Sequence, residues 1–156
     1  MLHRVECWHY KCLKRIDVEL GAINILVGPN ASGKSTLLDV FDFLRDALEK
    51  DVETAVRQRG TALREIVWNQ ADKKSGFELA LEMAIPHNFR HSSNSYDRLR
   101  YEVGVGLNFE GTLVVNGENL WLIDSSQSIA PRFIPQRTLF PLEPDDAKRV
   151  VRPAGS

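Results

Sequence analysis

Cysteine is scarce in this sequence of 156 residues, which contains only Cys7 and Cys12. The two lie five positions apart, and no second pair of cysteines follows to complete a zinc site. We therefore expect both side chains to be reduced thiols.

Long hydrophobic runs are also missing. No stretch approaches the roughly 18 apolar residues that a membrane span needs. The first residues carry His3, Arg4 and Glu6, so they lack the apolar centre of a signal peptide. We therefore expect a cytoplasmic protein without membrane contact.

An excess of charge of either sign is absent, because the formal net charge is -1. The whole-molecule field therefore gives no reason to expect strong attraction to nucleic acid or to an anionic membrane. Hydrophobic residues make up 43% of the chain and charged residues 26%, which is typical of a globular protein and excludes general disorder. The length predicts one compact domain.

Two apolar patterns precede residue 28. Ile16, Val18 and Leu20 alternate with polar residues, as in a half-buried strand. The run from Ile23 to Val27 is almost continuously apolar, which predicts a strand buried on both faces.

A helix is predicted after this run. Its apolar positions recur at helical spacing and are Leu37, Phe41, Leu44 and Leu48. The more polar stretch 51–60 is expected to extend the helix as far as Gly60, since glycine favours the left-handed conformation at helix ends. A short helix or turn is predicted around Leu63, Ile66 and Val67.

The second half of the chain has the period of β-strands. Residues 77–85 and 101–109 alternate between apolar and other residues, with a polar loop between them at 86–97. Asn116 and Gly117, between the strand-like stretches 112–115 and 119–123, predict a tight hairpin turn. Residues 125–156 contain five prolines and are predicted to form an irregular tail.

One motif carries chemistry. The pattern G-x-x-x-x-G-K-[ST] is matched at every fixed position, and the expected nucleotide-binding residues are Gly28, Pro29, Asn30, Ala31, Ser32, Gly33, Lys34, Ser35 and Thr36. A chain of this length matches the fixed positions by accident on the order of once in two hundred. The apolar run before the loop and the amphipathic helix after it are the context that a functional phosphate loop requires.

The spacing has a physical purpose. Gly28 and Gly33 allow the backbone N–H groups to turn toward phosphate oxygens, and the anion then lies at the positive end of the helix. Lys34 is expected to reach the β- and γ-phosphates, Ser35 to coordinate Mg²⁺, and Thr36 to add a donor to the α-phosphate. The sequence therefore predicts binding of a purine nucleoside triphosphate, Mg-ATP in our interpretation.

These residues also resemble a family. The pair Tyr10 and Lys11, the strand 16–20, the loop G-P-N-A-S-G-K-S-T and the helix L-L-D-V-F-D-F-L are similar to the ABC-type ATPases of the SMC and RecF branch. That branch includes the OLD-like, AAA-family ATPases of DNA repair and phage defence. Arg59 and Gly60 match the arginine-glycine turn after the first helix of SMC heads.

The resemblance implies an α/β fold, a P-loop NTPase lobe with an attached antiparallel β-meander, apparently incomplete. It implies an N-terminal lobe at 1–124, with a P-loop core at 1–70 and an antiparallel sheet at 76–124, followed by the tail 125–156. ATP and Mg²⁺ are the implied cofactors. A C-terminal ATPase lobe, an ATP-dependent homodimer and DNA are the implied partners.

Departures from the family bear on hydrolysis. Active members supply a Walker B strand ending in aspartate and glutamate, a signature motif and a switch histidine, and none of these is found. The nearest candidate, Leu120 to Asp124, is followed by Ser125 in place of the glutamate, and we favour a plain strand there. Gln70, Gln127 and Gln136 are equal candidates for the Q-loop glutamine. We expect hydrolysis to need C-terminal motifs, with the isolated chain inactive or very slow.

Two alternatives stay open. A small P-loop kinase or GTPase would need an arginine-rich lid or the tetrapeptide N-K-x-D, and the sequence lacks that tetrapeptide. A non-catalytic nucleotide-binding remnant would need neither, and the absence of Walker B carboxylates supports it.

Other chemically notable residues fit structural or solvent-exposed roles. His87 and His91 fit a solvated loop better than a metal site, and Trp8, Trp68 and Trp121 are expected to pack in the core. The acidic face formed by Asp39, Asp42 and Asp46 is expected to face solvent. The basic group of Arg57, Arg59 and Arg64 is expected to lie on the surface, with DNA contact as the alternative.

Overall fold

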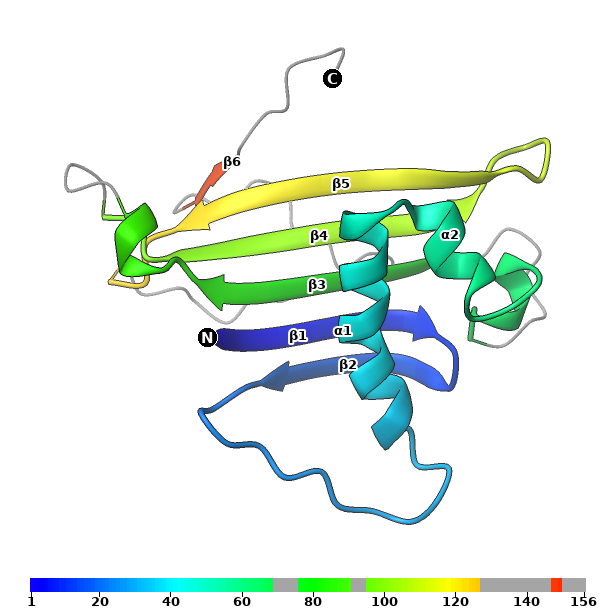
Figure 1. Cartoon of the computed structure of the whole chain (residues 1–156), viewed down its shortest axis with the longest axis horizontal. Coiled ribbons are helices and arrows are strands. Elements are labelled where there is room, and N and C mark those ends of the chain that lie inside the picture. Colours follow the sequence, from blue (N-terminus) through cyan, green and yellow to red (C-terminus); the bar gives the residue numbers. More distant parts are fainter. Residues whose placement is uncertain (69–75, 91–94, 127–146, 150–156) are drawn as a thin grey trace.

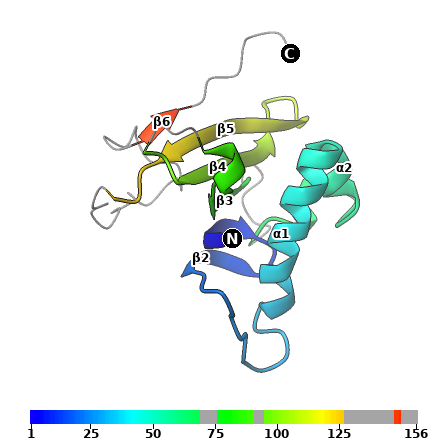
Figure 2. The same cartoon turned by 60° about the vertical axis from the view of Figure 1, so that its left-hand side comes forward.

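The computed structural model describes residues 1–68, 76–90, 95–126 and 147–149, the last as backbone only. One antiparallel sheet, in the order β2-β1-β3-β4-β5-β6, carries the main helices on a single face (Figures 1 and 2). The strands are β1 (Leu2–Tyr10), β2 (Leu13–Glu19), β3 (Phe77–Ala84), β4 (Arg98–Leu107), β5 (Leu113–Ile123) and β6 (Ala147–Arg149). The helices are α1 (Lys34–Glu49) and α2 (Val52–Arg57), with the short 3₁₀ turns η1 (Leu63–Glu65) and η2 (His87–Phe89).

The centre of the sheet follows the period-2 pattern. In β1, Val5 and Cys7 face the helices and lie opposite Leu81 and Leu79 of β3. Alternation along β3 and β4 predicted these two strands, and the structure confirms them as antiparallel neighbours. Both cysteines are free thiols, Cys7 buried and Cys12 exposed, as expected.

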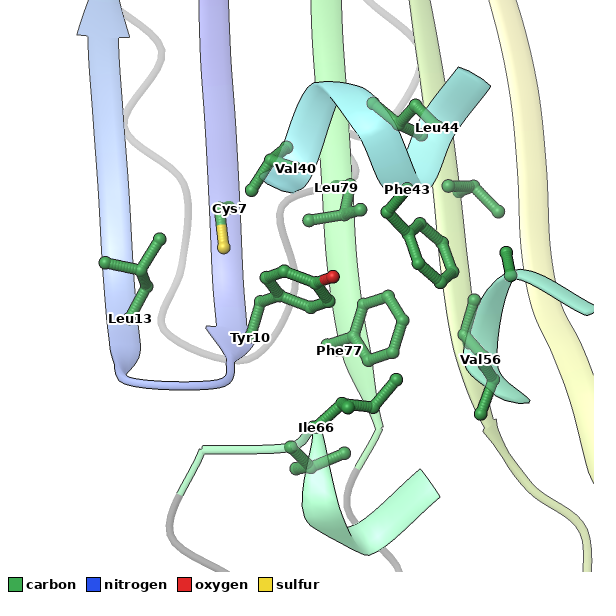
Figure 3. Packing of buried hydrophobic residues seen from close by; sticks show 14 of the residues in the cluster. Cys7, Tyr10, Leu13, Val40, Phe43, Leu44, Val56, Ile66, Phe77 and Leu79 are labelled. Carbon is green, nitrogen blue, oxygen red and sulfur yellow. The ribbon is translucent and has the colours of Figure 1, made fainter. Parts of the chain in front are cut away.

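Helix α1 lies across this face and closes the core. Its buried apolar residues are Leu37, Val40, Phe43 and Leu44. Of the four predicted positions, Leu37 and Leu44 are buried, whereas Phe41 is half-buried and Leu48 is exposed. Tyr10, Phe43 and Phe77 pack edge to face, with ring centroids 5.0 to 5.8 Å apart (Figure 3). Such pairs stabilise a core beyond the area they bury.

The helix does not continue through residues 51–60. Asp51 has an extended backbone, and its side chain accepts a hydrogen bond from the Thr54 amide at 2.6 Å. This is an N-cap, which ends one helix and starts the shorter α2. The prediction of a single extended helix is therefore wrong, whereas the short turn predicted near Leu63 is confirmed as η1.

The predicted hairpin at Asn116 and Gly117 is also wrong. Strand β5 runs without a break through both residues, and the chain reverses between β4 and β5 instead. The Asn108 side chain accepts hydrogen bonds from the amides of Glu110 and Thr112, and Gly111 adopts a positive φ of 80°. These features stabilise a turn at residues 108–112, ahead of the predicted turn at Asn116 and Gly117.

A bulge explains why the Asn-Gly pair does not turn. Gly104 pairs with Gly117 and Val105 with Val115, so Asn116 is the extra residue. A Cβ atom on Gly106 would lie 2.2 Å from the Asn116 side-chain nitrogen. The amide therefore fills space that a glycine on the neighbouring strand leaves open.

The segment from Ile23 to Val27 does not form the predicted buried strand. It is exposed, and within the described ranges it pairs with no other strand. A strand buried on both faces needs neighbours at its edges and layers above and below it. The hydrophobic pattern shows that the segment is suited to the interior of a sheet. It does not show whether the chain provides the neighbouring strands and covering layers.

The face of the sheet opposite α1 holds a buried charged cluster that the sequence did not reveal. Arg100 donates hydrogen bonds to Glu6 at 2.6 Å, to Glu102 at 2.6 Å and to Glu82 at 3.1 Å. All four side chains are buried, and Trp121 Nε1 donates to Glu102 at 2.9 Å. Strands β1, β3, β4 and β5 are thus joined by side chains as well as by their ladders.

Several predicted features fall near or beyond the limits of the described residues. Leu120 to Ile123 belong to β5, which confirms the plain-strand interpretation. Gln70, Gln127, Gln136 and His91 lie outside the described residues. Within the predicted irregular tail, residues 147–149 form β6 beside β5. None of the described helices has the length and apolar character that a bilayer crossing requires.

Candidate nucleotide-binding site

The phosphate-loop motif lies between the exposed segment and α1, below the helix in Figure 1. Gly33 is the N-cap of α1 and has a left-handed backbone with φ of 94°. Ala31 has a φ of 63° and Gly28 one of 156°. The loop therefore makes the sharp turns that the glycine spacing predicts, and the helix begins at Lys34.

The first turn of α1 is open to an anion. Within the described residues no side chain caps it, and the turn contains no acidic residue. The first amides of any helix lack intrahelical acceptors, and the helix dipole adds partial positive charge there. A phosphate group satisfies both features at once.

Close packing favours glycine at position 33. A Cβ atom there would lie 2.8 Å from Leu13 Cδ2 and 3.4 Å from Cys12 Sγ. The turn between β1 and β2 thus packs directly against the loop. Cys12 Sγ also lies 3.2 Å from Thr36 Oγ1, so this turn contacts the first helical turn as well.

Lys34 is folded back onto the loop. Its ammonium group donates to the carbonyl oxygens of Gly28 at 2.8 Å and Pro29 at 2.6 Å, and to Ser32 Oγ at 3.2 Å. Phosphate oxygens can take the place of these three oxygen acceptors. The same cation therefore holds the loop together and lies where an anionic ligand would meet it.

A charged cluster anchors α1 beside the loop. Asp39 accepts hydrogen bonds from Tyr10 at 2.6 Å and from Arg59 Nε at 2.9 Å, and it pairs with Lys11 at 2.6 Å. Burial alone would raise the pKa of Asp39, but the hydrogen bonds from Lys11 and Tyr10 and the charge of Arg59 lower it. Asp39 is thus an ionised anchor.

Comparison with known proteins assigns the chain to a family. The family model described as "AAA domain, putative AbiEii toxin, Type IV TA system" matches residues 23–152. The chain belongs to this AAA domain family. It is also similar to the OLD nuclease of Thermus scotoductus (strain ATCC 700910 / SA-01), with 41% identity over 44 residues. That match covers 28% of this chain and 8% of the nuclease. The resemblance to the OLD-like ATPases is confirmed at this level.

Within this AAA domain, the acidic face of α1 corrects one expectation. Asp39 and Asp46 do not face solvent freely, because both pair with Arg59. Asp42 is exposed, and among the described residues its ion pair is with Arg45, at 2.9 Å. Asp39 and Asp46 are seven positions apart, which places them on the same side of α1 two turns from each other. This spacing is the sequence signal that one long cationic side chain could pair with both.

The three arginines of the predicted basic group differ in exposure. Arg57 and Arg64 are exposed, as expected. Arg59 is not a surface residue: its side chain is buried over the Phe43 ring and held by Asp39 and Asp46. It therefore joins the segment after α2 to α1 and is unavailable to DNA. Of the tryptophans, Trp121 is buried as expected, whereas Trp8 and Trp68 are half-buried beside His9.

Proposed function

We propose that this AAA domain binds Mg-ATP through Gly28–Thr36, as the N-terminal lobe of an ABC-type ATPase of the SMC, RecF and OLD-like branch. The observation that carries the proposal is the open N-terminus of α1, preceded by the left-handed Gly33 and followed by Lys34. Membership of an AAA family supports nucleotide as the anion.

Each polar residue has a role in this proposal. Lys34 exchanges its loop carbonyls for β- and γ-phosphate oxygens, and Thr36 donates to the α-phosphate. Ser35 is exposed at the start of the helix, and its hydroxyl oxygen is a ligand of the kind that Mg²⁺ accepts. The metal would neutralise phosphate charge, while the chain's own residues bind and orient the triphosphate.

Hydrolysis needs more than this loop. A positioned water and a general base are required, and Asp124, the one carboxylate of the Walker B-like stretch, accepts hydrogen bonds from Ser126 instead. We propose that a C-terminal lobe supplies these groups and that ATP drives dimerisation. On the resemblance we also propose work in DNA repair or phage defence; the name of the similar protein says only that it is a nuclease.

A binding role without catalysis is the second candidate. Ser125 follows Asp124 where the catalytic glutamate of the family would stand. Its amide and its hydroxyl both donate hydrogen bonds to the Asp97 carboxylate. In this alternative the chain holds ATP as an assembly or regulatory module. Both candidates require the same phosphate loop.

Titration of a fluorescent ATP analogue with Mg²⁺ tests the binding claim. Replacing Lys34 by alanine removes the cation that meets the phosphates, so we expect the dissociation constant to rise by about tenfold or more. Lys50→Ala is the matched control, because it removes the same charge just beyond the other end of α1. Equal dissociation constants for wild type and Lys34→Ala would contradict the proposal.

A further inference from the structure

A groove of about 360 Å³ opens between α2, the η1 turn and the base of the β4–β5 hairpin. We name it the hairpin groove. The apolar part of its wall comes from Val56, Leu63, Leu107 and Leu113, of which Leu107 and Leu113 are only half-buried. Pockets of about 300 Å³ already hold small ligands, so the hairpin groove has room for one large side chain.

The rim of the hairpin groove carries an arginine that can meet an anion. Arg57 and Arg64 both line the groove and are exposed. Arg57 pairs with Glu53, which also lines the groove, whereas Arg64 forms no ion pair within the described residues. The neighbouring Glu65 accepts hydrogen bonds from Thr61 instead. The groove therefore suits a partner that presents an apolar side chain next to a carboxylate.

Two side chains of this kind stand at the tip of the same hairpin. Phe109 is fully exposed, and the next residue, Glu110, is exposed as well and has no ion pair in the described part of the chain. Hydrogen bonds fix the turn that carries them. The Asn108 amide donates to the Thr112 carbonyl at 2.9 Å, and the Gly111 amide donates to the Asn108 carbonyl at 3.0 Å. A tip that is already ordered loses little conformational freedom when it binds.

The tip does not fill the groove of its own chain. The Phe109 ring is in water and is not part of the groove wall. Tip and groove nevertheless lie at one corner of the molecule, because Leu107 and Leu113 flank the turn and also line the groove (Figure 1). A two-fold axis near this corner brings the tip of each copy to the groove of the other, and such an arrangement closes after two copies.

We propose that two copies of the protein associate through this corner, with Phe109 of each copy in the hairpin groove of the other and Glu110 beside the opposing Arg64. The small contact predicts a weak dimer, with a dissociation constant between about 10 µM and 1 mM. The corner and the phosphate loop lie at opposite ends of α1, whose 16 residues span about 24 Å (Figure 1). The association therefore needs no nucleotide and differs from the ATP-driven dimer proposed above.

Sedimentation equilibrium of the purified protein without nucleotide, over about 10 µM to 1 mM, measures this association. Phe109→Ala should raise the dissociation constant by at least about tenfold, because each dimer loses both aromatic anchors. Phe89→Ala is the matched control and should have no effect, since that ring is exposed on η2, at the other end of the sheet. Phe109→Ala should also leave the thermal unfolding midpoint unchanged, because the ring contacts water in the single chain.

Charge reversal tests whether the two positions meet across copies. Arg64→Glu and Glu110→Arg each place like charges in both contacts of the dimer, so each should raise the dissociation constant about three- to tenfold. In an equimolar mixture of these two variants, the mixed dimer pairs opposite charges at both contacts. Association in the mixture should therefore return to within about threefold of the wild type. A purely structural role of either residue within its own chain does not produce this recovery.

Several results would overturn the proposal. A protein that stays monomeric up to about 1 mM would do so and would assign the groove to another occupant, such as an acidic segment of a different protein. Equal effects of Phe109→Ala and Phe89→Ala, or no recovery in the mixture, would do so as well. The same holds for a dimer that forms only with Mg-ATP or is lost in Lys34→Ala. Failure of this association and failure of nucleotide binding are therefore distinguishable.

Discussion

At the scale of single residues, the loop depends on Gly33 for two separate reasons, its φ of 94° and its contact with Leu13. Gly111 has a φ of 80° but nothing within 4 Å of its missing Cβ, so it isolates the backbone effect. We expect Gly111→Ala to lower the free energy of unfolding by about 1 to 2 kcal/mol, and Gly33→Ala to lower it further through the steric clash. Urea unfolding of both variants measures the difference. Equal losses would mean that the turn between β1 and β2 moves aside at no cost.

At the scale of elements, α1 is tied to β1 and to the segment after α2 by Asp39. The folded pKa of Asp39 lies below its ordinary value of 3.8, so its stabilising effect is complete at neutral pH and is lost as the pH falls below about 4. We expect Asp39→Asn to lower the free energy of unfolding at pH 7 by about 1 to 3 kcal/mol. At pH 3 the difference from wild type should shrink. Asp42→Asn, which breaks an exposed pair, should change stability by less than about 0.5 kcal/mol. Chemical denaturation at both pH values checks this, and a loss for Asp39→Asn that is the same at pH 3 and pH 7 would contradict it.

Elements also show what the sequence could and could not predict. Helix α1, strands β3 and β4 and the loop between Val27 and Lys34 were predictable because their signals are local: periodicity, glycine spacing and a helix start. The Asn-Gly pair misled because its side chain fills a gap over Gly106, a contact between strands. Arg59 was misplaced because it packs over Phe43 and pairs with two aspartates, all three on α1. Contacts between residues far apart in the sequence determine these two positions, and hydrophobic periodicity carries no information about such contacts.

At the scale of the whole molecule, the sheet has two unlike faces. One packs apolar residues against α1, and the other is centred on Arg100, which bonds three carboxylates contributed by β1, β3 and β4. Removing a buried partner leaves uncompensated charge, so we expect Arg100→Met to lower the free energy of unfolding by about 3 to 5 kcal/mol. Arg4→Met, which removes a half-exposed arginine from the edge of the same cluster, should lower it by about 1 kcal/mol or less. Urea unfolding distinguishes the two, and similar losses would show that the cluster is not a shared structural centre.

The position of β1 has a consequence for synthesis on the ribosome. Its hairpin with β2 can close early, but its other edge pairs with β3, which ends at Ala84. Until that residue has left the exit tunnel, the second edge of β1 stays open while the apolar residues before the phosphate loop are already outside. A nascent chain halted before Ala84 therefore exposes two surfaces at once, the unpaired edge of β1 and the apolar segment before the phosphate loop. We expect chaperones to contact the chain mainly during this stage of translation.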